Sequence, residues 1–451
     1  MIRLGLTIRG KIVIITSAIL LAVSIYWFTT PRELYIITSI ILIMLILSDW
    51  IVTRGLLITL DRLRIERIYD EKIYDGEEVD IKISISNDGA SGLYGVYIED
   101  RYPDTLKLVD GYNHGVVNIP PKSRIEFTYR LRGEAVGRHV FGETILRIVE
   151  PLGFYEINAI YNRDKADAIR CMPSIPRVDL REYSKRGYRL FVGSWYAKYH
   201  GYSMEYKDIR EYHPGDEYRK IDWKATARTG KLMIREYEAE AENNIVLVLD
   251  LSRNMFIGEL GIRKYDYACR TISFIVNYCI DTRDRIGLVL LSRSYPRIIR
   301  MATATPRLFT DILDTLSSIN IYPPREDDLT GFDLSRIIKL LGIRDKTLFI
   351  FISDLEDEDR ARIIIDGVKT IRAMRHEVIF ISPLTVLFEA RILEGLDAAV
   401  YRTIGYQVSL IHRRIVGELS KYGIPVITVG PEDLIPVILM KMEEYRRVIA
   451  T

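Results

Sequence analysis

The sequence Asn244-Ile-Val-Leu-Val-Leu-Asp250 continues as Leu-Ser252-Arg-Asn254-Met255. An apolar run of this length with polar residues on both sides predicts a buried strand of a parallel sheet. The side chains that follow then lie beyond the carboxyl end of the strand, where open α/β sheets bind their ligands. Asp250, Ser252 and Asn254 supply hard oxygen ligands, which suit Mg²⁺, Mn²⁺ or Ca²⁺ better than zinc or copper.

The region 244–451 alternates between strands and helices. Apolar spacing predicts helices at 262–280, 307–319, 333–341, 358–375, 407–421 and 434–447, and strands at 285–292, 346–353, 377–382 and 424–429. Such alternation indicates a parallel sheet covered by helices on both faces, which is an α/β doubly wound domain.

Two apolar runs, 12–28 and 34–52, lie near the start of the chain and carry no charge before Asp49. Each is long enough to cross roughly 30 Å of hydrocarbon. Residues 29–33 form a tight connector between them, so residues 1–53 predict a transmembrane helical hairpin. The alternative, a signal peptide followed by a core helix, is disfavoured because a signal peptide has one short apolar region and a cleavage site.

Basic residues flank the hairpin on the outer sides of its two spans. Arg3, Arg9 and Lys11 precede the first span, and four arginines follow the second, whereas Arg32 alone lies between them. The positive-inside bias therefore places both ends of the hairpin and all later residues in the cytoplasm. The expected location is the cell membrane, with two spans and cytoplasmic soluble domains.

Residues 66–165 carry short alternating runs such as Val79-Asp-Ile-Lys-Ile-Ser-Ile-Ser. Turn signals separate these runs, beginning with Asn87-Asp88-Gly89. The pattern predicts an antiparallel β-sandwich. No constellation of catalytic groups occurs in this region, so we expect a spacer and interaction module.

Residues 166–243 are expected to be a linker, and within it the signature block 205–230 is dense in charged and aromatic side chains. Asp216 is expected to cap a short helix and Gly230 to follow its end. The block predicts either a salt-bridged structural segment or a docking surface, because Arg, Tyr and Trp anchor protein interfaces. The residues concerned are Arg210, Tyr212, Pro214, Gly215, Asp216, Arg219, Asp222, Trp223 and Arg228.

The spacing Arg210-Glu-Tyr-x-Pro-Gly-Asp-x-x-Arg219-x-Ile-Asp222-Trp223-x-x-Thr226-Ala-Arg228, followed by Asp250-x-Ser252-x-Asn-Met, resembles the domain-of-unknown-function-58 family. The resemblance implies a membrane hairpin, a β-rich domain and a C-terminal von Willebrand factor A domain. It also implies a partner, because members of the family are associated with MoxR-type AAA+ ATPases. It gives an architecture and a partner rather than a reaction.

Two later residues complete what resembles the metal-ion-dependent adhesion site (MIDAS) of A domains. Thr330 offers a hydroxyl before a helix, and Asp354 ends the strand at 346–353. The expected ligands are therefore Asp250, Ser252, Asn254, Thr330 and Asp354, around Mg²⁺ or else Mn²⁺ or Ca²⁺. Asn254 departs from the second serine of the family pattern, and a metal-free site is the alternative. A filled site leaves one coordination position for a partner's carboxylate, so it acts as a binding switch.

Composition sets aside several other functions. The 63 basic and 61 acidic residues give a net charge of +2, which argues against nucleic acid as a partner. Three cysteines are too few for a disulfide framework or a zinc site. No G-x-x-x-x-G-K-S/T, H-E-x-x-H or G-x-S-x-G motif occurs, and no enzyme is expected. A single glutamine, with abundant Ile, Arg, Lys and Glu, favours an archaeal or thermophilic source.

Three hypotheses for function follow. The first is a membrane-tethered cytoplasmic adaptor, chaperone-like, that engages a MoxR-type ATPase or its client through the MIDAS-like face. The second is an extracellular adhesion receptor, which the charge bias and the absence of any N-x-S/T site oppose. The third is a hydrolase acting through Asp216, Asp222 and His213, although salt bridges to neighbouring arginines explain these carboxylates equally well.

Overall fold

A computed structural model describes residues 2–26, 32–150, 152–163, 167–176, 206–213, 216–218, 221–237, 243–292, 297–322, 334–343, 345–389 and 396–450. The chain divides into two compact units, Met1–Met172 and Pro173–Thr451.

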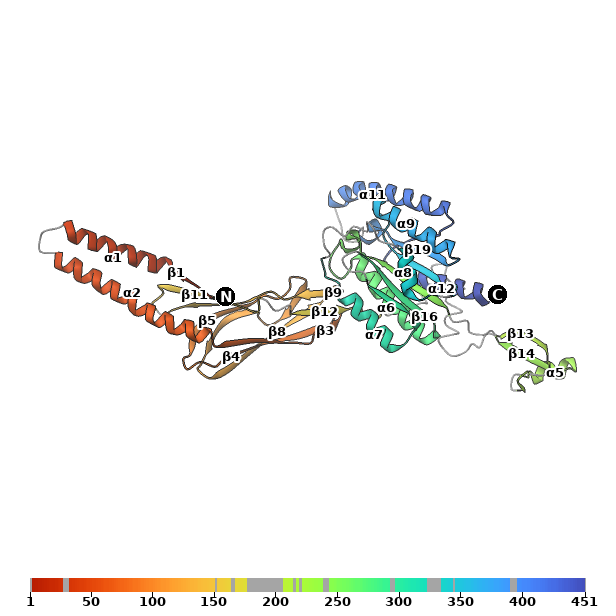
Figure 1. The fold of residues 1–451 in the computed structure, drawn as a ribbon, viewed down its shortest axis with the longest axis horizontal. Helices are drawn as coiled ribbons and strands as arrows, with labels where there is room; N and C mark the ends of the chain where they lie inside the picture. The colour runs from red at the N-terminus through yellow and green to blue at the C-terminus, as the bar shows by residue number, and fades with distance from the viewer. Residues whose placement is uncertain are drawn as a thin grey trace. The chain divides into compact units, whose positions relative to one another are not determined.

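The first unit begins with a short strand and a helical hairpin (Figure 1). β1 spans Ile2–Leu6, α1 spans Ile8–Tyr26, and α2 spans Arg32–Leu60. Both helices are long and apolar enough to cross a membrane, in agreement with the expected hairpin. α2 runs past the expected end at 52 because its last turns, including the fully buried Leu60, pack on the core of the following sheets.

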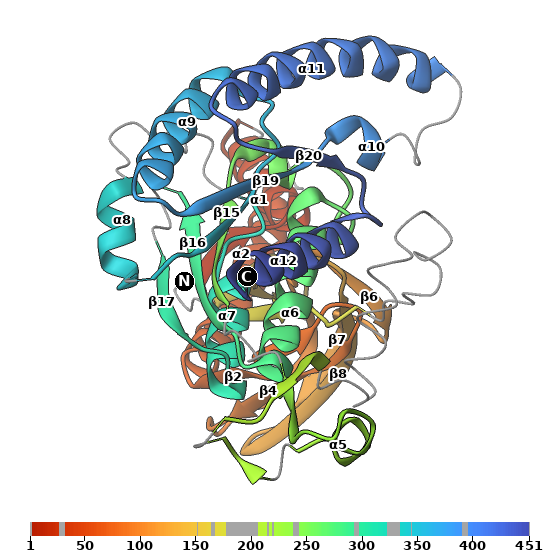
Figure 2. The ribbon, with the colours of Figure 1, turned by 90° about the vertical axis from the view of Figure 1, so that its right-hand side faces the viewer.

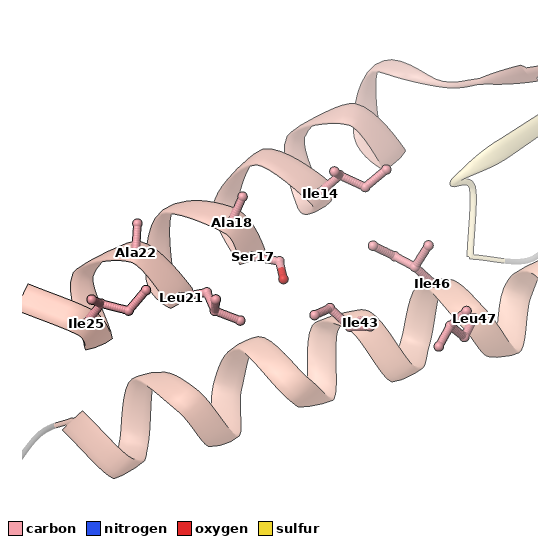
Figure 3. A pocket seen from close by; sticks show the side chains of 9 residues that line it. All are labelled: Ile14, Ser17, Ala18, Leu21, Ala22, Ile25, Ile43, Ile46 and Leu47. Carbon is pink, nitrogen blue, oxygen red and sulfur yellow. The ribbon is translucent and has the colours of Figure 1, made fainter.

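The two helices of the hairpin meet at a pair of serines. The Oγ atoms of Ser17 and Ser39 lie 3.1 Å apart, and Ser39 Oγ also donates to the Ser17 carbonyl at 3.1 Å. These contacts satisfy both hydroxyls within an otherwise apolar pair of helices. An open pocket of about 470 Å³ lies between the two helices, and apart from Ser17 its lining is apolar. Figure 3 shows the lining side chains of α1 and α2.

The rest of the first unit is rich in strands. One antiparallel sheet has the order β1-β11-β10-β5-β7 and a second has the order β2-β4-β8-β6. A small sheet, β3-β12-β9, completes the body. The strands are β2 Leu63–Ile68, β3 Lys72–Tyr74, β4 Glu78–Asn87, β5 Leu93–Asp100, β6 Leu106–Asp110, β7 His114–Ile119, β8 Ser123–Gly133, β9 Gly137–Val140, β10 Thr144–Val149, β11 Tyr155–Tyr161 and β12 Ala168–Met172.

One apolar core joins the two larger sheets. The expected alternation is present in the first part of β4, where Val79, Ile81 and Ile83 are buried while Asp80 and Lys82 between them are exposed. Ile98 of β5 and Leu146 of β10 enter the same core from the other sheet. The unit extends to Met172 rather than to the expected 165, because β12 pairs with β9 and with β3.

Both ends of the hairpin are attached to this β-rich body. β1 pairs with β11 in the register Ile2↔Ala159, and the ring of Trp50 on α2 lies 5.6 Å from that of Tyr155. Gly10, in the first turn of α1, lies so close to the Phe154 carbonyl that a Cβ would collide with it. The strand that precedes α1 and the strand that follows α2 therefore lie in the same body.

The second unit is built on a six-stranded sheet with the order β17-β16-β15-β18-β19-β20. The strands are β15 Asn244–Asp250, β16 Arg285–Leu291, β17 Ile298–Thr303, β18 Leu348–Ile352, β19 Glu377–Pro383 and β20 Val426–Val429. β15 is central and runs parallel to both β16 and β18. Asp250 therefore ends a buried central strand, as the apolar run predicted.

β17 was not predicted, and it corrects the expectation of a wholly parallel sheet. It pairs antiparallel with β16, in a register that joins Arg285 to Thr303. Residues 292–297 are too few for the crossover of a dozen or more residues that a parallel neighbour needs. The sheet is consequently parallel except at this edge.

Helices lie on both sides of the sheet (Figure 2). α8, α9 and α11 pack on one face, where Val248 and Phe351 of the sheet meet Ile364 of α9. α6, α7 and α12 lie on the other side, and α12 contacts both α6 and β18. The helices are α6 Lys264–Thr282, α7 Pro306–Ser317, α8 Leu334–Leu341, α9 Glu358–Ala373, α10 Thr385–Glu389, α11 Leu396–Lys421 and α12 Leu434–Ala450.

Candidate functional site

The signature block forms a β-hairpin that carries a short helix. β13 Tyr206–Glu211 pairs antiparallel with β14 Met233–Tyr237, and α5 Trp223–Thr229 lies between them in sequence. Ile221 forms an isolated bridge with Ile234, and both side chains are buried. The block is therefore a folded element, which we call the signature hairpin (206–237), rather than an extended linker.

Asp216 does not cap α5, contrary to expectation. Its carboxylate accepts hydrogen bonds from the Arg210 Nη1 and Nη2 atoms, each at 2.8 Å, and from the His213 backbone N–H at 2.9 Å. These donors, Arg210 first, lower the pKa of Asp216 to about 2. Asp216 thus ties β13 to the turn that follows it, and this role leaves it unavailable as a cap.

Asp222 is the actual N-cap of α5. Its Oδ1 accepts from the backbone N–H groups of Lys224 and Ala225 at 2.9 and 3.0 Å, and the residue is 5% exposed. Gly230 follows the helix in the left-handed conformation, with φ of 70°, as predicted. The two ends of α5 are therefore fixed by one carboxylate and one glycine.

Several aromatic and basic side chains of the signature hairpin face solvent. Trp223 is 68% exposed and Tyr218 is 72% exposed, and the Tyr218 ring lies 5.5 Å from that of Tyr212. Arg228 is exposed at the end of α5. Pro214, Gly215 and Arg219, which belong to the predicted set, lie outside the described residues.

The second candidate site lies at the carboxyl end of β15, where Asp250 is only 1% exposed. Arg360, near the start of α9, donates from Nε to Asp250 Oδ1 at 2.8 Å and from Nη2 to the same atom at 2.5 Å. Ser353 Oγ donates to Asp250 Oδ2 at 2.7 Å. Burial raises the pKa of Asp250, while Arg360 and Ser353 oppose that rise.

Asp354 lies two residues after the neighbouring strand β18 and is paired with a different buried cation. Lys264, the first residue of α6, donates from Nζ to Asp354 Oδ2 at 3.0 Å, to Glu356 Oε2 at 3.2 Å and to Thr385 Oγ1 at 2.7 Å. Lys264 is 2% exposed. Burial raises the pKa of Glu356, and the Lys264 charge acts against that change.

Ser252 connects the two carboxylates of this cluster. Its backbone N–H donates to Asp250 Oδ1 at 3.1 Å, and its hydroxyl lies 3.4 Å from Asp354 Oδ2. Asn254, in the following 3₁₀ turn, is partly exposed, and its side chain takes no part in the hydrogen bonds among the described residues of the cluster. The structure thus brings Asp250, Ser252 and Asp354 together, whereas Thr330 lies outside the described residues.

This arrangement does not fit a divalent metal ion. Mg²⁺ requires a near-octahedral shell of oxygens at about 2.0–2.1 Å. Both oxygens of Asp250 and one oxygen of Asp354 already accept hydrogen bonds, two of these atoms from positively charged side chains. Among the described residues, no group of three or more His, Cys, Asp or Glu side chains is placed to hold a metal.

The sequence pattern missed Lys264 and Arg360, although a signal for both exists. In a parallel sheet, the helix that follows each strand begins at the edge where that strand ends. Lys264 and Arg360 lie in the first turns of the helices that follow β15 and β18. Charged residues at those positions are therefore expected close to Asp250 and Asp354.

Comparison with known families identifies the segment that holds both sites. Residues 208–384 match the family described as "Protein of unknown function DUF58", which confirms the resemblance over this segment. "Uncharacterized protein YeaD" of Bacillus subtilis (strain 168) is 25% identical over 182 residues, covering 40% of this chain and 45% of that protein. "Uncharacterized protein Rv1480" of Mycobacterium tuberculosis is 28% identical over 188 residues, covering 41% and 56%. The match thus spans about half the length of these curated relatives.

Two solved structures are also similar to parts of the chain. An aerotolerance-related membrane protein from Bacteroides fragilis NCTC 9343 has 13% identity and a TM-score of 0.27, covering 45% of this chain and 99% of its own. The SpRpn10 VWA domain has 13% identity and a TM-score of 0.26, covering 43% of this chain and 94% of its own. At these scores neither likeness supports an inference about function.

Proposed function

We propose that this chain, which carries a DUF58 segment at 208–384, is a membrane-tethered cytoplasmic adaptor that binds a MoxR-type AAA+ ATPase or the client of that ATPase. Its two apolar helices supply the anchor. In this proposal the β-rich body is a sandwich that serves as a spacer, and the doubly wound unit is a von Willebrand factor A-like domain. The partner follows from the family resemblance.

One observation carries the proposal: the described residues of the signature hairpin are held by internal hydrogen bonds, yet large aromatic side chains among them face solvent. Asp222 and Gly230 fix the two ends of α5, and the pair Arg210–Asp216 ties β13 to the turn that follows it. Trp223 and Tyr218 are nevertheless mostly exposed. Exposed Trp, Tyr and Arg on a fixed scaffold are the residues that dominate binding energy in protein interfaces.

We assign docking to the signature hairpin rather than to the MIDAS-like face. Asp250 and Asp354 are each 1% exposed, and their charges face buried cations of the same chain. A partner's carboxylate has no access to them in this arrangement. The exposed cations Lys224 and Arg228 of the hairpin favour an acidic surface on the partner.

The hydrolase alternative is disfavoured by the roles of the same residues. Asp216 is held by Arg210, and Asp222 caps α5, so both carboxylates already have structural partners. The receptor alternative requires the soluble parts of the chain to lie outside the cell. The basic residues that flank the two apolar helices α1 and α2 argue against this orientation.

The test compares Trp223→Ala with Tyr322→Ala, a control that removes a side chain of similar exposure, 65%, outside the signature hairpin. The full chain in detergent is titrated with the purified ATPase. Loss of a central aromatic anchor costs about 2 kcal/mol or more in binding, which is a roughly 30-fold weaker Kd. Equal affinity of both variants and the wild type would refute docking through this hairpin.

A further inference from the structure

We propose that the Lys264 ammonium is the resident cation of the MIDAS-like cluster, so that this site is built to work without a divalent metal. The cluster consists of Asp250, Ser252, Asp354, Glu356 and Thr385, together with the cations Lys264 and Arg360. The inference concerns the chemistry of this buried site, whereas the proposed function concerns the exposed signature hairpin.

Lys264 contacts one of the oxygen atoms that the predicted metal site would use. Its Nζ lies 3.0 Å from Asp354 Oδ2, the same atom that lies 3.4 Å from the Ser252 hydroxyl. Asp354 and Ser252 both belong to the predicted ligand set. The ammonium is therefore bonded to one predicted ligand, Asp354, next to a second, Ser252, and it uses all three of its protons on oxygen acceptors.

Arg360 pairs with Asp250, the other carboxylate of the predicted set. Two of its nitrogens donate to Asp250 Oδ1, and Nη2 also donates to the Leu291 carbonyl at 2.8 Å. The cluster as a whole holds three carboxylates and two cations, all nearly or fully buried. Buried carboxylates need compensating positive charge, and here Lys264 and Arg360 of the same chain provide that charge instead of a metal ion.

The first turn of α6 holds Lys264 in place. Arg263, its neighbour, is 1% exposed and donates to Asp266 from Nε at 2.8 Å and from Nη2 at 2.9 Å. Arg263 Nη1 also donates to the Ile321 carbonyl at 3.0 Å. These bonds fix the start of the helix, so the Lys264 side chain is directed into the cluster by a rigid turn rather than by a mobile surface segment.

A resident ammonium also changes how the site could be regulated by a partner. A metal-filled site changes its state when a partner's carboxylate completes the coordination shell, whereas an ammonium held by three internal acceptors has no open position. If the chain is the adaptor proposed above, this cluster should therefore contribute no Mg²⁺-dependent step to the binding of a partner.

The test measures Mg²⁺ and Mn²⁺ binding to the full-length chain in detergent after treatment with a chelator. Calorimetry with millimolar Mg²⁺ should give no binding heat for the wild type, and Mn²⁺ should keep the electron paramagnetic resonance spectrum of the free ion. A bound-ion Mn²⁺ spectrum in the wild type that is lost in Asp354→Asn would overturn the proposal, because it would identify Asp354 as a metal ligand.

Lys264→Ala provides the converse experiment. Removal of the ammonium leaves Asp354 and Glu356 facing each other without a cation, so Mg²⁺ should raise the melting temperature of this variant while leaving that of the wild type unchanged. Lys346→Ala, which removes an exposed lysine paired with Glu377, is the matched control and should not respond to Mg²⁺. A Lys264→Ala variant that folds and does not respond would refute the assignment.

The outcomes separate this inference from the proposed function. If the wild type binds Mn²⁺ at Asp354 while Trp223→Ala still loses the ATPase, the resident-cation inference fails and docking stands. If the site is metal-free but no ATPase binds, the adaptor proposal fails and the inference stands. Should Lys264→Ala not fold, the wild-type Mn²⁺ spectrum alone decides.

Discussion

Replacing Asp250 by alanine is the most direct test of how the central strand of the second unit is held. Asp250 is 1% exposed, and Arg360, at 8%, donates two hydrogen bonds to one of its oxygens. The variant would leave the guanidinium buried without its carboxylate. We therefore expect a large loss of stability, even though Asp250 was predicted from the sequence as a metal ligand.

The magnitude follows from the burial of both partners. Breaking a buried ion pair by removing one member costs about 3–5 kcal/mol. For a domain of roughly 150–250 residues, each kcal/mol lowers Tm by about 2–4 °C, so a fall of roughly 6–20 °C is expected. The exposed pair Lys369–Asp366 is the matched control, and Asp366→Ala should cost less than about 1 kcal/mol.

Differential scanning calorimetry of the full chain in chelator-containing buffer provides the measurement. The double variant Asp250→Ala with Arg360→Met removes both charges and should be more stable than the sum of the single variants predicts. The ion-pair account would be refuted if, without metal, Asp250→Ala lowered Tm by less than about 2 °C, and if Mg²⁺ raised the Tm of the wild type but not that of the variant. That result would support Asp250 as a metal ligand.

Three further results are expected. Asp222→Ala removes the N-cap of α5 and should cost about 1 kcal/mol locally, seen as faster hydrogen exchange in residues 223–229 only, whereas unfolding of the whole unit would contradict the cap assignment. The pKa of Asp216 is lowered from 3.8 to about 2, so its stabilisation of the signature hairpin is complete above pH 3.8 and is lost as the pH falls towards 2. Amide hydrogen exchange in the signature hairpin should therefore be faster in Asp216→Asn than in the wild type at pH 6, and the two rates should converge near pH 2. Equal exchange rates at pH 6 would refute this. A cysteine introduced at position 30 should react with a membrane-impermeant maleimide on intact cells, whereas one introduced at position 229 should not. The three native thiols are buried and should not react. Labelling at 229 but not at 30 would overturn the cytoplasmic topology. The native thiols are Cys171, Cys269 and Cys279.

Patterns that repeat along the chain were predictable from the sequence. The alternation in β4 and the run before Asp250 gave correct strands, because burial on one or both faces dictates which positions are apolar. The helix at 407–421 was placed correctly but starts at Leu396, since its first turns lack a strong apolar period. β17 was missed because an edge strand with only one buried residue carries little periodic signal.

The candidate sites were harder to predict because their contacts join distant parts of the chain. The pair Arg360–Asp250 spans 110 residues, and Lys264–Asp354 spans 90. The sequence around Asp250 and Asp354 shows their carboxylate oxygens but not the cations that pair with them. The pattern therefore predicted a metal ion as the source of positive charge. The N-cap was misassigned for a different reason, because the sequence does not locate the first residue of a short helix: α5 begins at Trp223, directly after Asp222, whereas Asp216 lies six residues earlier and pairs with Arg210.

The helical hairpin is joined to the β-rich body at two places, and this limits how the helices can move relative to that body. A single flexible segment after the second helix would allow a β-rich body to swing freely beneath a bilayer. Here β1, before α1, pairs with β11, while α2 leads within three residues into β2, so the helices are clamped at both ends to one body. A relative movement of α1 and α2 would therefore have to be taken up by the β1–β11 pairing or by the short connection to β2, because neither helix joins the body through a long loop.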